Sequence, residues 1–349
     1  MTQDPHRAAA TSQAAPSKIA IVRSLLDTLM GNAPVDATVI LSNTHGGSNS
    51  EGAQATGKIP SLVLAGRSLE ALAACHTALC ATDQQSLQSV LRPKIAELRK
   101  ALEHELLTAQ DIDLVSATGR THLLPRRSVL IGRPSSEKTV DVAVNCRWFS
   151  RGDRNLSLFC EGAGWFVEDI GSTNGSFVQG QALKPGHPLA LPVGETRIEV
   201  GAAKDATALA VVHIHRPAKD PGAVVITLSG VPASANSQPD PWPSMQDDIK
   251  RRWVVFREQI GVSAAEDCAL RVDGDLPGII AAIRYQSGFW VVPSSQCTSH
   301  IDDIVFRESV PLAIGANLTL GGTRLRVEQQ MPASSIAIGA ANQQHLRAG

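Results

Sequence analysis

The sequence predicts an α+β protein, with a helical N-terminal region followed by all-β sandwich domains. In the first third of the chain, apolar residues recur at helical spacing. After residue 111 they fall instead in short runs that are rich in β-branched and aromatic residues and bounded by Gly, Pro or Asn. The change of pattern near residue 110 predicts a domain boundary there. The length of 349 residues is enough for two or three domains.

The helical region is expected over residues 17–110, after a disordered tail at residues 1–16. Ser17 is placed to cap a helix with the apolar stripe Ile19, Val22, Leu25, Leu26 and Leu29. A cluster of Ser, Asn and Gly with one Pro predicts a loop at residues 42–60. A second helical block is expected over about residues 68–108, and no role is assigned to the region.

Many short strands at near-regular spacing predict sandwiches or barrels. They divide into one domain at residues 111–216 and another at residues 217–328, with a Pro-rich loop near residues 232–249 and a flexible tail at residues 329–349. The expected strands are residues 128–131, 155–159, 165–168, 189–191, 196–200, 209–214, 224–228, 253–256 and 325–327.

Three ordered matches suggest that the second stranded region is a copy of the first, the alternative being chance similarity between β-proteins. The matches are Ile131-Gly132 with Ile260-Gly261, Gly164-Trp165-Phe166-Val167 with Gly288-Phe289-Trp290-Val291, and Leu183, Gly186, Leu189 and Leu191 with Leu312, Gly315, Leu318 and Leu320.

Composition excludes several classes of protein. The net charge of −1 argues against a protein that is basic throughout and binds nucleic acid. The longest apolar runs are too short to span a membrane, and the N-terminus lacks the apolar segment of a secretory signal. Six cysteines are too few for a disulfide scaffold of this length. We therefore expect a cytoplasmic protein.

The most specific string is Asp-Ile-Gly-Ser-Thr-Asn-Gly at residues 169–175, directly after a predicted strand that contains Trp165. Upstream lie Gly132-Arg133, at the end of a predicted strand, and Ser150-Arg151 in a predicted loop. This ordered set resembles the forkhead-associated (FHA) domain, a phosphothreonine-binding β-sandwich, over about residues 111–216.

The resemblance implies roles for individual residues. In the family, the residues that match Arg133, Ser150, Thr173 and Asn174 contact the phosphate and the peptide, and Arg151 would support them. The motif is completed by Gly132, Asn155, Gly171, Ser172 and Gly175. Asn155 stands where the family usually has His, and Ser150-Arg151 lie two residues further upstream than in the family. Either this loop carries a two-residue insertion or its role has changed.

These residue types suit a phosphothreonine, which carries about −1.5 to −2 charges and three strong acceptor oxygens. Arg133 can supply a charge-assisted hydrogen bond, Ser150 and Thr173 supply hydroxyl donors, and Asn174 can hold the backbone of a peptide. Residues 118–157 contain eight Lys or Arg against three Asp or Glu. Such a local excess of positive charge fits one small dianion better than a nucleic-acid strand.

The second copy lacks these groups. The matches place Gly261-Val262 where the first copy has Gly132-Arg133, and residues 294–299 where it has Ser-Thr-Asn-Gly. A valine cannot bind phosphate, so the second copy is expected to be a degenerate FHA-like sandwich kept for packing, oligomerisation or partner contact.

The predicted function is a phosphothreonine-dependent adaptor whose partner is a phosphothreonine-containing protein, either a Ser/Thr protein kinase or a kinase substrate. No catalytic constellation, metal site or cofactor is expected, and neither nucleic acid nor membrane is an expected partner. The alternative is a phospho-independent assembly protein that uses both sandwiches as contact surfaces. Formation of a homo-oligomer through the second sandwich stays open.

Overall fold

The computed structural model describes residues 17–31, 49–80, 85–108, 110–134, 139–144, 149, 156–201, 210–230, 251–273, 278–295, 297 and 299–330. A helical unit ends at Leu106, and a β unit begins at Leu107. The predicted tail at 1–16, the loop near 232–249 and residues 331–349 of the predicted C-terminal tail lie outside the described residues. No helix in the described part of the chain is long and apolar enough to cross a membrane.

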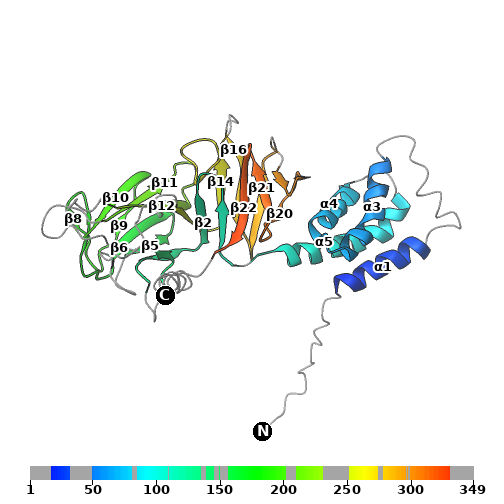
Figure 1. Cartoon of the computed structure of the whole chain (residues 1–349), viewed down its shortest axis with the longest axis horizontal. Coiled ribbons are helices and arrows are strands. Elements are labelled where there is room, and N and C mark those ends of the chain that lie inside the picture. The colour runs from blue at the N-terminus through cyan, green and yellow to red at the C-terminus, as the bar shows by residue number, and fades with distance from the viewer. Residues whose placement is uncertain are drawn as a thin grey trace, which may run out of the picture. The chain divides into compact units, whose positions relative to one another are not determined.

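Four helices are described in the helical unit (Figure 1): α1 (Lys18–Gly31), α3 (Asn49–Leu64), α4 (Ser68–Cys80) and α5 (Gln85–Leu106). The predicted cap of the first helix is confirmed, since the Ala20 amide donates to Ser17 Oγ at 3.3 Å. On α5, Ile95, Leu98 and Leu102 form a buried apolar stripe. Burial of such stripes supplies most of the stability of helices of this length.

Two predictions in the helical unit are wrong. Residues 49–60 of the expected loop belong to α3, where Ala55, Ile59 and Val63 form a buried stripe at a spacing of four residues. Tertiary packing of that stripe overrides the low helix propensity of the Gly and Pro around it. The predicted apolar face of the first helix includes Ile19, but that side chain is 57% exposed and Ile21 is buried instead.

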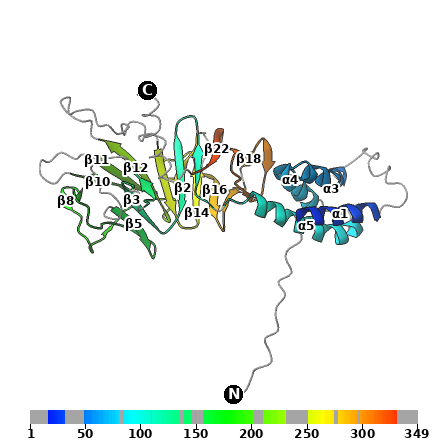
Figure 2. The ribbon, with the colours of Figure 1, turned by 60° about the horizontal axis from the view of Figure 1, so that its bottom comes forward.

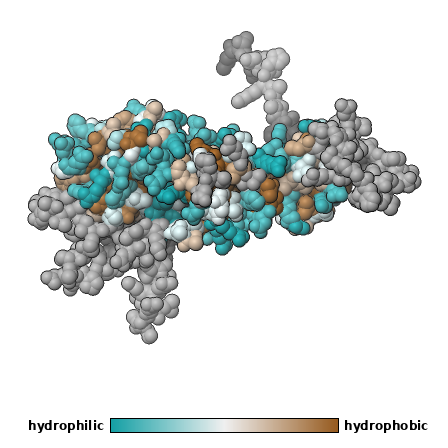
Figure 3. Space-filling model, turned by 90° about the horizontal axis from the view of Figure 1, so that it is seen from above, coloured by the Kyte–Doolittle hydropathy of each residue, from teal (hydrophilic) through white to brown (hydrophobic). Residues whose placement is uncertain are grey.

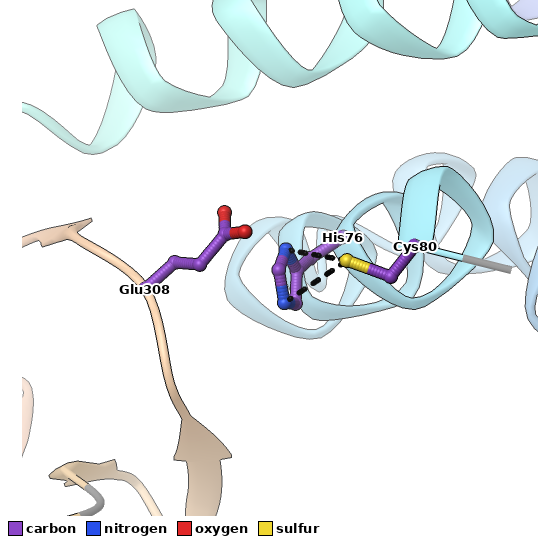
Figure 4. A group of neighbouring side chains, drawn as sticks. All are labelled: His76, Cys80 and Glu308. Atoms are coloured by element: carbon purple, nitrogen blue, oxygen red, sulfur yellow. Dashed lines mark hydrogen bonds between the residues drawn. The ribbon is translucent and has the colours of Figure 1, made fainter. Parts of the chain in front are cut away.

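Two cysteines of α4 differ sharply in their surroundings. Cys75 is fully buried, and this burial raises the pKa of its thiol to about 12. Cys80 is exposed, and Figure 4 shows it beside the ring of His76, one turn away on the same helix, with Sγ 3.7 Å from Nε2. Because the thiolate is the reactive form, the two thiols differ in reactivity.

We predict that DTNB at pH 8 modifies Cys80 rapidly in the native chain and leaves Cys75 unmodified. With a pKa of about 12, only about one Cys75 thiol in ten thousand is ionised at pH 8. Peptide mapping by mass spectrometry after a short exposure measures both sites. Unfolding the chain in guanidinium should expose Cys75 to the reagent, and equal labelling of both thiols in the native chain would contradict the prediction.

The β unit is built on one continuous sheet of twelve strands (Figures 1 and 2). In spatial order its strands are β19 (Ile304–Phe306), β18 (Ser299–Ile301), β21 (Asn317–Leu320), β22 (Thr323–Gln329), β1 (Ile112–Val115), β2 (Arg120–Pro125), β13 (Arg251–Phe256), β12 (Ala223–Gly230), β11 (Ala210–Arg216), β10 (Gly194–Val200), β7 (Ser176–Val178) and β8 (Gln181–Ala182).

Two small sheets of five strands complete two sandwiches. The first small sheet has the order β4 (Val142–Ala143), β3 (Ser128–Gly132), β5 (Leu156–Glu161), β6 (Gly164–Asp169) and β9 (Leu189–Ala190). The second has the order β15 (Leu270–Arg271), β14 (Gln259–Ser263), β16 (Ile279–Tyr285), β17 (Phe289–Pro293) and β20 (Val310–Pro311). Each expected strand named above coincides with one of these elements to within a few residues, so the α+β class is confirmed.

The two small sheets cover opposite faces of the long sheet. On β13, Trp253 and Val255 belong to the core that contains Trp165 of the first small sheet. Phe256 points to the other face, because side chains alternate along a strand, and its ring lies 6.4 Å from that of Phe289 in the second small sheet. The central strands of the long sheet are therefore buried on both faces.

Strand pairing also crosses between the two sandwiches. β1 and β2 precede the first small sheet in the chain, yet β1 pairs with β22 and β2 pairs in parallel with β13. On the other side, β11 pairs with β12 across the predicted domain boundary. The boundaries at residues 110, 216 and 328 stay a prediction, and the strands on either side of residue 216 form one sheet.

A polar network marks the place where the core of the first sandwich ends. The ring of His122 stacks on Trp253 with centroids 5.1 Å apart, and its Nδ1 lies 2.6 Å from Asp113 Oδ1. Arg120 donates to Asp113 at 2.6 Å and to Glu328 at 2.9 Å. The buried carboxylate of Asp113 is thus compensated by an arginine and a histidine on the neighbouring strand.

The surface of the described residues carries few large exposed apolar side chains: Ile19, Leu64, Val193, Ile279, Val305 and Ile314. Figure 3 shows hydrophobic residues interspersed with hydrophilic ones on the face in view. Scattered apolar residues of this kind are normal on a folded protein and do not by themselves indicate an interface.

Candidate functional site

Two of the predicted site segments meet at one end of the first small sheet. In the ladder, Ile131 of β3 lies opposite Leu156 of β5, and Leu156 lies opposite Asp169 of β6. Both β3 and β6 are antiparallel to β5, so they run in the same direction. Their last residues lie at about the same level across the sheet, next to Leu156. The backbones of the two strands are about 10 Å apart. Arg133 and the turn at residues 170–175 therefore emerge side by side.

The turn at residues 170–175 is held by the buried carboxylate of Asp169. The Gly171 amide donates to Oδ1 at 3.0 Å and the Ser172 amide at 2.6 Å, while the Ser172 hydroxyl donates to Oδ2 at 2.5 Å. Gly171 and Gly175 have φ values of 100° and 74°, which lie in the left-handed region that favours glycine. Ser172 is therefore used within the turn, consistent with its predicted structural role.

The turn leaves Thr173 exposed and Asn174 and Arg133 partly exposed. All three lie at the same end of the sandwich, on segments that strands β3, β6 and β7 hold in place. Ser150, Arg151 and Asn155 lie outside the described residues. Their segment leads into β5, whose first residue, Leu156, shares the row with Ile131 and Asp169.

The local positive charge seen in the sequence is only partly available at this end. Arg126 is bound by the carboxylates of Asp111 and Asp141, and Arg120 by those of Asp113 and Glu328. The count over residues 118–157 leaves out Asp111 and Glu328. It therefore overstates the positive charge that is not paired with a carboxylate. Burial raises the pKa of the Asp111 carboxyl above its usual value, and the nearby charge of Asp113 adds to this effect. The positive charge of Arg126 lowers this pKa but does not outweigh burial.

The strand order of the first sandwich is repeated in the second, which corrects two of the three sequence matches. The Leu191 amide donates to Trp165 O at 2.8 Å, and the Leu312 amide to Phe289 O at 2.9 Å. Leu191 is thus equivalent to Leu312, and Trp165 to Phe289. The leucine alignment that pairs Leu183 with Leu312 is wrong, whereas the pairing of Gly164-Trp165 with Gly288-Phe289 agrees with the structure.

The same comparison shows which residue of the second sandwich corresponds to Arg133. The Val144 amide donates to Gly132 O, and the Val272 amide donates to Ser263 O, so Gly132 is equivalent to Ser263. Arg133 therefore corresponds to Ala264, not to Val262, because the second sandwich places the end of its strand two residues later than the sequence match does. Asp169 corresponds to Pro293, which has no carboxylate to hold the turn.

Residues 129–201 match the family of the FHA domain. The chain contains an FHA domain. The matched segment begins within β3 and ends just after β10, and it includes both Arg133 and the turn at residues 170–175. An FHA domain is a binding module, so this part of the chain is not catalytic. A comparison with curated proteins gives no match.

Solved FHA structures also resemble the chain. The FHA-1 domain of Mycobacterium tuberculosis Rv1747 is 20% identical, covers 26% of this chain and 85% of its own, and has a TM-score of 0.19. The FHA1 domain of yeast Rad53 is 19% identical, covers 28% of this chain and 71% of its own, and has a TM-score of 0.20. The FHA domain of an Arabidopsis thaliana hypothetical protein is 17% identical, covers 38% of this chain and 95% of its own, and has a TM-score of 0.21. At TM-scores this low, the family match is the observation that assigns the FHA domain.

We predict that Asp169→Ala loosens the binding end of the FHA domain. The substitution removes the acceptor of three hydrogen bonds, and we expect the free energy of unfolding of the β unit to fall by about 1–3 kcal/mol. Urea unfolding followed by tryptophan fluorescence measures this. Glu161→Ala, at an exposed carboxylate of β5, is the matched control and should change stability by less than about 0.5 kcal/mol. Equal effects of the two variants would contradict the assigned role of Asp169.

Proposed function

We propose that the FHA domain binds a phosphothreonine segment of a partner protein and that the chain acts as an adaptor. The observation that carries this proposal is the placement of Arg133 and the turn at residues 170–175 at one end of a rigid sheet, within the segment that matches the FHA family. Recognition of phosphate requires a guanidinium and short polar donors that converge from ordered loops.

Each proposed contact follows from the chemistry of its side chain. The guanidinium of Arg133 makes charge-assisted hydrogen bonds to the phosphate, and the exposed Thr173 supplies a hydroxyl. Asn174, next in the turn, uses its amide to hold the backbone of the bound peptide. Ser150 and Arg151 are assigned to the phosphate by their resemblance to the family. The domain needs neither a metal ion nor a cofactor for this role.

The chemistry of the ligand identifies the class of partner. Phosphothreonine is the product of a Ser/Thr protein kinase, so the proposed partner is such a kinase or one of its substrates. The proposed place of action of the adaptor is the cytoplasm. The second sandwich, which has Ala264 and Pro293 in place of the arginine and the aspartate, does not contribute a second site of this kind.

The test is binding of a phosphothreonine peptide library to the full-length chain, with the same peptides unphosphorylated as controls. Selective retention of phosphopeptides is the expected result. Equal retention of both sets, together with partner complexes that survive phosphatase treatment, would overturn the proposal. That outcome would favour a phospho-independent assembly protein.

A further inference from the structure

Three polar side chains form a hydrogen-bonded chain across the strands β10, β11 and β12 of the long sheet. The ring of His213 lies between the other two, with Nδ1 2.6 Å from Glu195 Oε1 and Nε2 2.9 Å from Ser229 Oγ. The residues that precede His213 and Ser229 belong to the core of the first sandwich. Because side chains alternate along a strand, His213 and Ser229 point to the opposite face of the sheet. Their separations of 16 and 18 residues in the chain leave no local motif in the sequence.

The carboxylate determines which ring nitrogen of His213 carries the proton. An ionised carboxylate only accepts hydrogen bonds, so Nδ1 donates to Glu195. In the neutral imidazole Nε2 is then an acceptor, and the hydroxyl of Ser229 donates to it. A hydroxyl held in this way can pass its proton to the imidazole as its oxygen attacks an electrophile. The three groups therefore stand in the order that activates a serine nucleophile.

His122 provides a comparison within the same sheet. Its Nδ1 also lies 2.6 Å from a carboxylate oxygen, that of Asp113, but its buried Nε2 has no hydrogen-bond partner among the residues that the structure describes. A carboxylate alone orients an imidazole, whereas activation of a nucleophile also requires a hydroxyl at the other nitrogen. Of these two histidines, His213 alone has both partners.

The three side chains are also accessible from solvent. Ser229 is partly exposed, and the side chains of His213 and Glu195 are 30% and 60% exposed. A small electrophile can therefore reach the serine oxygen. These residues supply a nucleophile and a base but no assigned donor for an oxyanion, so the expected acceleration is that of a general base alone, about 100- to 10,000-fold.

We propose that Ser229 is a nucleophile that takes the acyl group of a small ester, with His213 as its general base and Glu195 as a positioning residue. The serine oxygen bonds to the carbonyl carbon, the bond from this carbon to the alcohol oxygen breaks, and the serine proton passes through His213 Nε2 to the departing alcohol. Water then attacks the acyl carbon and gives its proton, through the same nitrogen, to the serine oxygen, which releases the acid.

This activity is separate from phosphopeptide binding. The nucleophile and the base lie on β11 and β12, outside the residues 129–201 that match the FHA family. The proposal therefore stands whether or not the FHA domain binds phosphothreonine.

The experiment measures labelling of the full-length chain by a fluorescent fluorophosphonate, a reagent for activated serines. The oxygen of Ser229 bonds to phosphorus, fluoride leaves, and the proton passes to His213 Nε2. Peptide mapping by mass spectrometry measures the rate at each serine. Ser128, exposed on β3, is the internal control, and we expect Ser229 to react at least about 100 times faster. Acetylation by p-nitrophenyl acetate, quenched in acid and mapped in the same way, should show the same order.

Three variants test the roles of the neighbouring groups. His213→Ala should slow labelling of Ser229 about 100-fold, and imidazole added to the buffer should restore part of the rate. Glu195→Gln should slow it by about two- to fivefold, the range expected for an ion pair at an exposed carboxylate. Arg197→Gln, at an exposed arginine two residues further along β10, is the matched control and should retain the wild-type rate.

Tryptophan fluorescence during heating checks that each variant is folded, and Tm should stay at the wild-type value because all three changes are at the surface. The proposal is overturned if either reagent labels Ser229 no faster than Ser128 in the folded wild type, or if His213→Ala reacts at the wild-type rate. Failure of imidazole to restore any of the rate would also overturn it, since the histidine would then have only a structural role.

Discussion

Arg133→Ala is expected to weaken binding of a phosphothreonine peptide by about 10- to 100-fold. A charge-assisted hydrogen bond contributes about 1.5–3 kcal/mol, and each 1.4 kcal/mol corresponds to a factor of ten in Kd. Arg133 directly follows β3 and emerges beside the turn that presents Thr173 and Asn174. Fluorescence anisotropy of a labelled phosphopeptide with the full-length chain measures the change.

The controls separate a loss of contact from a loss of fold. Arg324→Ala removes an exposed arginine of the second sandwich and should leave both Kd and Tm unchanged. Arg133→Lys keeps the positive charge but loses the planar guanidinium group, which can donate two parallel hydrogen bonds. Its affinity should therefore fall between those of the wild type and the alanine variant. Wild-type affinity in the folded Arg133→Ala protein would show that the phosphate binds elsewhere.

A chain that ends at residue 216 is expected to lose the native fold of the first sandwich. Strands β12 and β13 supply five buried side chains to its core: Val224, Ile226, Leu228, Trp253 and Val255. Burial of a large apolar side chain contributes about 1.5–3 kcal/mol, so the loss of five removes roughly 10 kcal/mol. This is as large as the whole stability of an ordinary domain. Without β12, strand β11 also lacks its hydrogen-bonded neighbour.

The matched control is a chain that ends at residue 330 and retains every described strand. It should unfold cooperatively at the Tm of the full chain, whereas the chain that ends at residue 216 should show no cooperative transition in near-UV circular dichroism. Trp165, fully buried in the intact protein, should then emit at longer wavelength. A cooperative transition of the shorter chain at the full-length Tm would show that the first sandwich is autonomous.

Local chemistry made much of this structure predictable. The cap at Ser17 and the strands of both sandwiches depend on periodicity and on side chains within a few residues of each other. The turn at residues 170–175 was equally predictable, because an aspartate and two glycines at fixed spacing determine its backbone conformation. The segment at residues 49–60 was not predictable in this way, because its helix is stabilised by packing against the other helices α4 and α1.

The alignment of the two sandwiches shows a second limit. Matching Ile260-Gly261 to Ile131-Gly132 places Val262 where Arg133 stands, although the ladder places Ala264 there. A β-strand repeats every two residues, so a shift of two preserves the apolar pattern and only hydrogen bonding reveals it.

Periodicity in the sequence was enough to predict most of the helices and the strands, and the ordered motif from Gly132 to Gly175 was enough to predict an FHA domain. Only the tertiary structure decided which strands are partners. It joined β1 to β22, more than two hundred residues away, and placed β12 and β13 between the two sandwiches. An alternating strand shows which side chains are buried, but its backbone can pair with any strand that has a free edge. The choice of partner depends on packing summed over the whole β unit.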